Sequence, residues 1–125
     1  MDIYPLGFKL AGLCHDLGHG PLSHAFDSIL QGICSEIDES HEARSVYVLK
    51  HIVQKYNIDI DESIVNMACE LIHPQEYDFP DFWYQIVASP NHVDVDKFDY
   101  ILRDCVHTGF KLSLDIKRFI EYARV

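Results

Sequence analysis

The sequence lacks the features that mark several common classes of protein. No apolar run approaches the roughly 20 residues that a membrane-spanning helix needs. No glycine-rich phosphate loop of the P-loop or dinucleotide-binding type occurs. The four cysteines form no Cys-x-x-Cys pair, which argues against a zinc knuckle or a redox dithiol. Since a cationic leader is also missing, we expect an intracellular protein, cytoplasmic or nuclear, that does not enter a membrane.

Basic residues are scarce and unevenly placed. The chain has 10 Lys and Arg against 20 Asp and Glu, which gives a formal net charge of −10 at pH 7. Residues 1–90 contain only four of the basic residues, whereas residues 91–125 contain six basic and six acidic ones. An acidic balance repels the phosphate backbone, so extended binding to nucleic acid is not expected. A small polyanion could still bind, through a metal ion and bases near the end of the chain.

Helical periodicity is what the sequence has in abundance. At 125 residues, 48% of them hydrophobic, the chain can form a single domain with a core. Apolar spacing, N-cap residues and proline breaks predict an all-α fold with seven helices. These cover residues 6–17, 21–30, 41–56, 62–72, 82–88, 95–107 and 115–124.

The apolar stripes of these helices predict which side chains lie inside. The first helix is apolar nearly all round, and the other long helices have one apolar face. Cys14 and Cys105 are interpreted as buried thiols. The further residues expected inside are Leu6, Leu10, Leu13, Leu17, Leu22, Phe26, Ile29, Leu30, Val46, Leu49, Ile52, Val53, Tyr56, Ile64, Val65, Ala68, Leu71, Ile72, Phe98, Ile101 and Leu102.

The doublet His15-Asp16, in the last turn of the first predicted helix, is the most informative motif. His19 and His24 follow within nine residues, and Asp27 comes three residues later. Buried imidazoles and carboxylates are costly unless they are paired or bound to metal. Imidazole nitrogen and carboxylate oxygen together suit a divalent transition metal. The alternative is a charged helix end beside a glycine turn, with histidines that serve only structural hydrogen bonds.

A second polar group lies on the helix predicted for residues 95–107. Asp96, Tyr100 and Asp104 share one face, and Lys97 lies at its margin. Asp96 could reach a metal held by the doublet, and Lys97 could contact a phosphate oxygen. Tyr100 and Asp104 could contact the edge of a ribose. A solvated helix face would also explain the charges, although it rarely needs the aromatic body of a tyrosine.

His41 and Glu42 lie in the first turn of the helix that Ser40 is predicted to cap. A carboxylate beside an imidazole can orient it as a proton donor, so a catalytic and a structural role both remain open. The remaining isolated histidines are interpreted as surface or structural residues. They are His51, His73 and His92.

The run from Leu13 to Asp27 closely resembles the signature of the HD-domain metal-dependent phosphohydrolases. With the later segments, the chain looks most like the deoxynucleoside triphosphate triphosphohydrolase branch of that family. The resemblance implies an HD-domain helical bundle, present in part: one domain over residues 1–125, truncated at both ends. The later segments are 93–100, 103–105, His107, 117–120 and 123–125.

The resemblance also implies a role for each motif. It gives one divalent metal, and the mixed nitrogen and oxygen ligands admit iron, manganese, zinc or magnesium. A further histidine ligand of the family, upstream of the doublet, has no counterpart here. The implied residues are His15, Asp16 and Asp96 for the metal, His19, His24, Asp27, His41 and Glu42 for acid–base and phosphate contacts, Lys97 for phosphate, and Tyr100 and Asp104 for the sugar.

The expected activity is hydrolysis of a deoxynucleoside triphosphate (dNTP) to deoxynucleoside and inorganic triphosphate, in a parent protein that is a homo-oligomer. One alternative keeps the HD fold but changes the substrate to nucleoside monophosphates or cyclic phosphodiesters. The other is a truncated HD module without catalytic activity.

Overall fold

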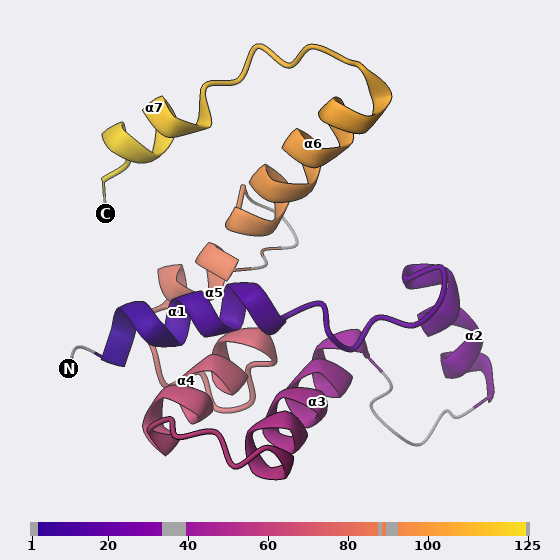
Figure 1. Cartoon of the computed structure of the whole chain (residues 1–125), viewed down its shortest axis with the longest axis vertical. Coiled ribbons are helices and arrows are strands. Elements are labelled where there is room, and N and C mark those ends of the chain that lie inside the picture. Colours follow the sequence, from indigo (N-terminus) through magenta and orange to yellow (C-terminus); the bar gives the residue numbers. More distant parts are fainter. Residues whose placement is uncertain (1–2, 34–39, 88, 90–92, 125) are drawn as a thin grey trace.

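A computed structural model describes residues 3–33, 40–87, 89 and 93–124, and within these ranges the regular structure is entirely helical. All seven predicted helices are present, so the all-α fold class is confirmed (Figure 1). None of the helices in the described ranges is long and apolar enough to cross a membrane. The helices are α1 (Ile3–Cys14), α2 (His24–Ile33), α3 (His41–Lys55), α4 (Glu62–Ile72), α5 (Asp81–Val87), α6 (Val95–Thr108) and α7 (Ile116–Tyr122).

The hydrophobic core lies mainly between α1 and α4, with α3 and α5 packed beside them (Figure 1). Seven of the eleven residues of α4 are buried. The face of α1 that meets them consists of small residues, because only Gly7, Ala11 and Cys14 are fully covered in that helix. A Cβ on Gly7 would lie 2.4 Å from the Sδ of Met67, so glycine allows the two helices to approach closely.

An aromatic cluster around Trp83 joins α5 to the start of α1. The rings of Tyr4, Phe8 and Phe79 each lie 5.2 Å from the Trp83 ring, centroid to centroid. The first two contacts are edge-to-face and the third is stacked. Such pairs are favourable beyond the area they bury, so this cluster fixes α5 on the body.

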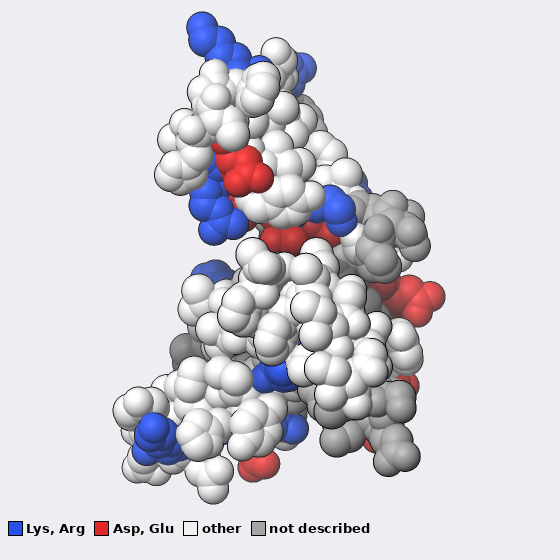
Figure 2. All heavy atoms as spheres, turned by 90° about the vertical axis from the view of Figure 1, so that its right-hand side faces the viewer, with Lys and Arg blue, Asp and Glu red and all other residues white. Residues whose placement is uncertain are grey.

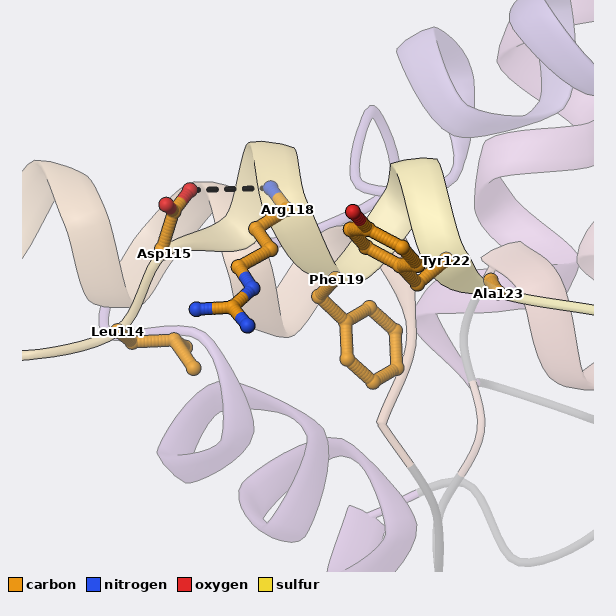
Figure 3. A pocket seen from close by; sticks show the side chains of 6 residues that line it. All are labelled: Leu114, Asp115, Arg118, Phe119, Tyr122 and Ala123. Atoms are coloured by element: carbon orange, nitrogen blue, oxygen red, sulfur yellow. Dashed lines mark hydrogen bonds between the residues drawn. The ribbon is translucent and has the colours of Figure 1, made fainter.

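Helices α2, α6 and α7 differ from the core helices, because they contain no buried residue. Figure 1 shows α2 to one side of the body, while α6 leads away from α5 and is followed by α7. The rings of Phe98 on α6 and Phe119 on α7 meet at 5.2 Å. Figure 3 shows a pocket along α7 that contains none of the predicted site residues; its lining is Leu114, Asp115, Arg118, Phe119, Tyr122 and Ala123.

The core prediction is confirmed for α4 and for Cys14, and is wrong for several residues of the other helices. Leu13 is 78% exposed and Leu22 is 86% exposed. Helix α2 also begins only at His24, because Leu22 and Ser23 adopt positive φ angles. An apolar stripe shows which face of a helix would be buried, but not whether a partner covers it. The other residues of the predicted core that are exposed or only partly buried include Leu17, Ile29, Tyr56, Phe98, Ile101, Leu102 and Cys105.

Candidate metal centre

The doublet lies in the turn directly after α1, rather than in the last turn of that helix. The amide of His15 still donates to the Ala11 carbonyl at 2.9 Å, as in a helix. The next bond, from the Leu17 amide to the Cys14 carbonyl at 3.2 Å, spans only three residues and tightens the chain. Since α1 is buried on one face, the backbone at its end is held in place, and so is the start of the doublet.

Ser45, the fifth residue of α3, holds this turn in place through two hydrogen bonds. The Ser45 hydroxyl is fully buried; it donates to the His15 carbonyl and accepts the Gly18 amide at 2.8 Å. A Cβ on Gly18 would lie 2.2 Å from the His41 carbonyl oxygen, so only glycine fits there. Sequence analysis missed Ser45, since a serine on a helix shows nothing of partners 27 and 30 residues away.

Three predicted metal ligands converge on one point. The Nε2 atom of His15 lies 3.3 Å from Oδ1 of Asp16 and 3.4 Å from Oδ1 of Asp96. Their ligand atoms all lie within 4.8 Å of one another. Asp96 reaches this point from the first turn of α6, a helix that packs against α5. The structure therefore brings together residues eighty positions apart in the sequence.

The residues fit a divalent metal on physical grounds. His15 Nδ1 lies 2.9 Å from the Gly12 carbonyl, which can only accept, so Nδ1 carries the proton of the neutral ring. The Nε2 atom then presents a lone pair; it is buried and makes no hydrogen bond within the described part of the chain. A lone pair that faces the carboxylates of Asp16 and Asp96 is repelled unless a metal ion or a proton lies between them, and these nitrogen and oxygen donors suit a divalent metal.

A cluster of three imidazoles adjoins the ligand group. The ring of His19 stacks on that of His41 at 3.9 Å, and the ring of His24 meets both edge-on, at 5.3 and 5.6 Å. His19 Nε2 lies 3.3 Å from Oδ1 of Asp16, which links the cluster to the doublet. Burial, and then the charge of His41, lower the pKa of His19, so its neutral form is favoured. This cluster provides nitrogen donors and acceptors directly beside the three ligands.

Two carboxylates flank His41. Burial by itself raises the pKa of Asp27, but hydrogen bonds from Arg44 and His41 outweigh this and hold that pKa below its ordinary value. Asp27 is therefore ionised at neutral pH and only accepts, so His41 Nδ1 is the donor in their 3.1 Å hydrogen bond. The other ring nitrogen, Nε2, lies 3.2 Å from Oε1 of Glu42. A carboxylate at each ring nitrogen thus holds the His41 ring in one orientation.

Lys97 follows Asp96 and is held by a carboxylate that sequence analysis did not single out. Its ammonium lies 2.8 Å from Oδ2 of Asp94 and donates to the Ser89 carbonyl. Asp94 is buried and caps α6 by accepting the Lys97 amide at 2.7 Å. Burial by itself raises the pKa of Asp94, but hydrogen bonds from Lys97 and from the Ser89 amide outweigh this effect. The net pKa lies below its ordinary value, so the carboxyl group is ionised.

Tyr100 and Asp104 continue the face of α6 that begins at Asp96. At 1.5 Å per residue, they lie about 6 and about 12 Å further along the helix axis. Both side chains are exposed, and the structure does not bring them into the ligand group. On the face of the molecule that Figure 2 shows, acidic side chains gather where the upper part meets the body, and Lys and Arg form separate groups.

Comparison with known families identifies the class to which this site belongs. The HD domain family model matches residues 6–104, a range that contains every predicted site residue. The chain belongs to the HD domain family. This confirms the family resemblance that the doublet and the Asp96 segment indicated.

Several curated relatives are named as dNTP hydrolases. The chain is 37% identical to deoxynucleoside triphosphate triphosphohydrolase SAMHD1 of Bos taurus and 36% identical to that of Homo sapiens, in each case over 94% of its own length. It is 39% identical to the SAMHD1 homolog of Dictyostelium discoideum. These matches cover 24%, 22% and 23% of the relatives, so the chain spans about a quarter of their length.

Proposed function

We propose that this chain carries the catalytic centre of a metal-dependent phosphohydrolase that cleaves dNTPs to deoxynucleoside and inorganic triphosphate. The observation that carries the proposal is the convergence of His15, Asp16 and Asp96 around an imidazole nitrogen that lacks a hydrogen bond within the described residues. The substrate class is supported by the names of the relatives and by similarity over 94% of the chain.

The metal would be held by His15, Asp16 and Asp96, and iron, manganese, zinc and magnesium all suit these donors. When bound, it supplies Lewis-acid polarisation of phosphate oxygens. Lys97 offsets negative charge on the phosphates, because Asp94 and the Ser89 carbonyl orient its ammonium beside Asp96.

The imidazole cluster handles protons. Hydrolysis to deoxynucleoside and triphosphate breaks the bond between the α-phosphorus and the 5′-oxygen, so that oxygen must receive a proton while water adds to phosphorus. His41 is suited to supply the proton, because Asp27 and Glu42 face its two ring nitrogens and hold the imidazole in place. His24 and His19 lie against its ring and contact the phosphates.

The rest of the nucleotide would lie along α6. Tyr100 and Asp104, one and two turns beyond Asp96, would contact the sugar. The formal net charge of −10 agrees with a small anionic substrate rather than an extended nucleic acid. For the whole protein we propose a homo-oligomer of the cytoplasm or nucleus.

Metal content and product analysis test the proposal together. The purified chain, loaded with manganese, is incubated with each dNTP, and triphosphate is separated by anion exchange. We expect about one metal per chain and triphosphate release. Asp96→Asn should lose both, with a rate at least about 100-fold lower. Asp99→Asn is the matched control on the same helix, because Asp99 is exposed and pairs with Arg103, which is not a site residue.

The alternatives predict other outcomes of the same experiment. Hydrolysis of nucleoside monophosphates or cyclic phosphodiesters without triphosphate release would replace the substrate class but keep the metal centre. A chain that binds no metal and hydrolyses none of these substrates would be the non-catalytic module.

A further inference from the structure

Arg44 joins three parts of the site through one side chain. Its Nε donates to the Gly18 carbonyl at 2.7 Å, in the turn that carries the doublet. Its Nη2 donates to Oδ1 of Asp27 on α2, and its guanidinium lies over the Phe26 ring, 5.5 Å from the centroid. The side chain is only 23% exposed. Neither the doublet nor the histidine pattern in the sequence points to this residue.

Helix α2 needs such a contact because burial does not hold it in place. It contains no buried residue, and Ile29 and Ile33, two of its large apolar side chains, are exposed. Yet α2 carries His24 and Asp27, whose positions matter for the imidazole cluster. Directional polar contacts to α3 must therefore set where this helix lies.

We propose that Arg44 is the positioning residue that locks the His41–Asp27 pair onto the turn of the doublet. It acts through Asp27: Arg44 occupies Oδ1 and His41 Nδ1 occupies Oδ2, so the carboxylate cannot rotate and the imidazole keeps one orientation. The bond to the Gly18 carbonyl fixes this unit relative to the metal ligands. Its effect on rate rests on the proposed function, whereas its effect on geometry does not.

The geometry requires an arginine in particular. A guanidinium donates in two directions from one rigid plane, here to a carbonyl and to a carboxylate. Lysine at position 44 would keep a positive charge for Asp27 but could not hold both partners in that plane. Methionine would keep much of the length and lose both bonds. These two replacements separate charge from geometry.

The first test observes the ring proton of His41 by NMR on the metal-free chain. In the wild type, the Nδ1 proton should be visible at low field and exchange slowly with water. Arg44→Met should accelerate exchange about tenfold, the factor that the loss of one hydrogen bond to a charged group gives, and Arg44→Lys should fall between the wild type and Arg44→Met. Lys55→Met, on the same helix and far from the site, is the control and should match the wild type.

The second test asks whether Arg44 acts through Asp27. Asp27→Asn removes the carboxylate, and adding Arg44→Met to it should produce no further acceleration of exchange. Independent residues would give additive effects, and additivity would overturn the proposal. An unchanged His41 proton in Arg44→Met would overturn it as well. If Arg44→Met fails to fold, the comparison between Arg44→Lys and the wild type decides the same question.

Kinetics distinguish this inference from the proposed function. In an active enzyme, Arg44→Met should lower kcat about tenfold with little change in KM, since substrate contacts remain. If the wild type releases no triphosphate, the proposed function fails while the NMR result still stands. If the wild type is active and exchange is unaffected in Arg44→Met, only the role of Arg44 fails.

Discussion

The region around α1 and α4 differs sharply from α2 and α6 in what holds it together. Helix α4 buries most of its side chains against small residues of α1, whereas α2 and α6 bury none. Yet α2 and α6 carry most of the predicted site residues outside the doublet. They are His24, Asp27, Asp96, Lys97, Tyr100 and Asp104. The packed helices α1, α3, α4 and α5 thus form a buried platform, and polar contacts position the site residues of α2 and α6 relative to it.

The doublet stands at the border between these two regions. His15 follows α1, which is buried on one face, and its carbonyl accepts a hydrogen bond from Ser45. The backbone of His15 is therefore fixed by the buried platform. Its side chain instead faces Asp96 on α6 and, through Asp16, the imidazoles of the cluster. Charges can therefore be changed on the site side of this border while the core remains intact. The following predictions test that separation.

The largest effect on stability is expected from Leu71→Ala in the core. Leu71 is 3% exposed and packs in the cluster between α1 and α4. Removing it should lower the free energy of unfolding by about 2–5 kcal/mol, because a cavity remains where the side chain was. Urea unfolding followed by circular dichroism measures this. A loss below about 1 kcal/mol would mean that the core is less tightly packed than the buried side chains of α4 indicate.

The contrast also explains how much could be predicted from the sequence. Periodicity and the Asp61 cap both predict helix α4 and its apolar face. That face is buried in the structure because α1 packs against it. The pattern of α2 is equally apolar, but Ile29 is exposed because no partner within the described residues covers it. Local patterns determine helices well, and they do not determine which helices meet.

The same limit applies to the site. Residue types and spacing predicted His15 and Asp16 as ligands, and the polar face of the later helix, together with the family resemblance, predicted Asp96 as their partner. Arg44 and Ser45 could not be found in this way, because their partners are backbone and carboxylate groups 17 to 30 residues away. Only the fold reveals such contacts.

A smaller effect, confined to the contact between α2 and α3, should depend on pH. The ordinary pKa of Asp27 is near 3.8, and its folded value is lower because hydrogen bonds from Arg44 and His41 outweigh the effect of burial. Its ionised form therefore stabilises the folded state above the ordinary pKa, and this contribution disappears as the pH falls through the folded value. The destabilisation caused by Asp27→Asn should accordingly be greater at pH 7 than at pH 3.

Leu71→Ala is the control for this pH dependence, because an apolar cavity does not titrate. Free energies of unfolding measured for both variants and the wild type at the two pH values give the comparison. An equal cost of Asp27→Asn at both pH values would show that the carboxylate adds no stability through its charge, and the polar account of α2 would then be wrong.

The smallest effect is expected from Ile29→Ser, which changes the apolar face of α2. Ile29 is 61% exposed, so serine should alter the free energy of unfolding by no more than about 0.5 kcal/mol. The His41 ring proton should also be unaffected, since Asp27 and Arg44 are untouched by the change. A loss above about 1 kcal/mol would mean that this face is covered in solution, because an isoleucine that remains in water contributes little to folding. Sedimentation of the two proteins would then show whether a second copy covers this face. In that case α2 would be held by burial as well as by polar contacts.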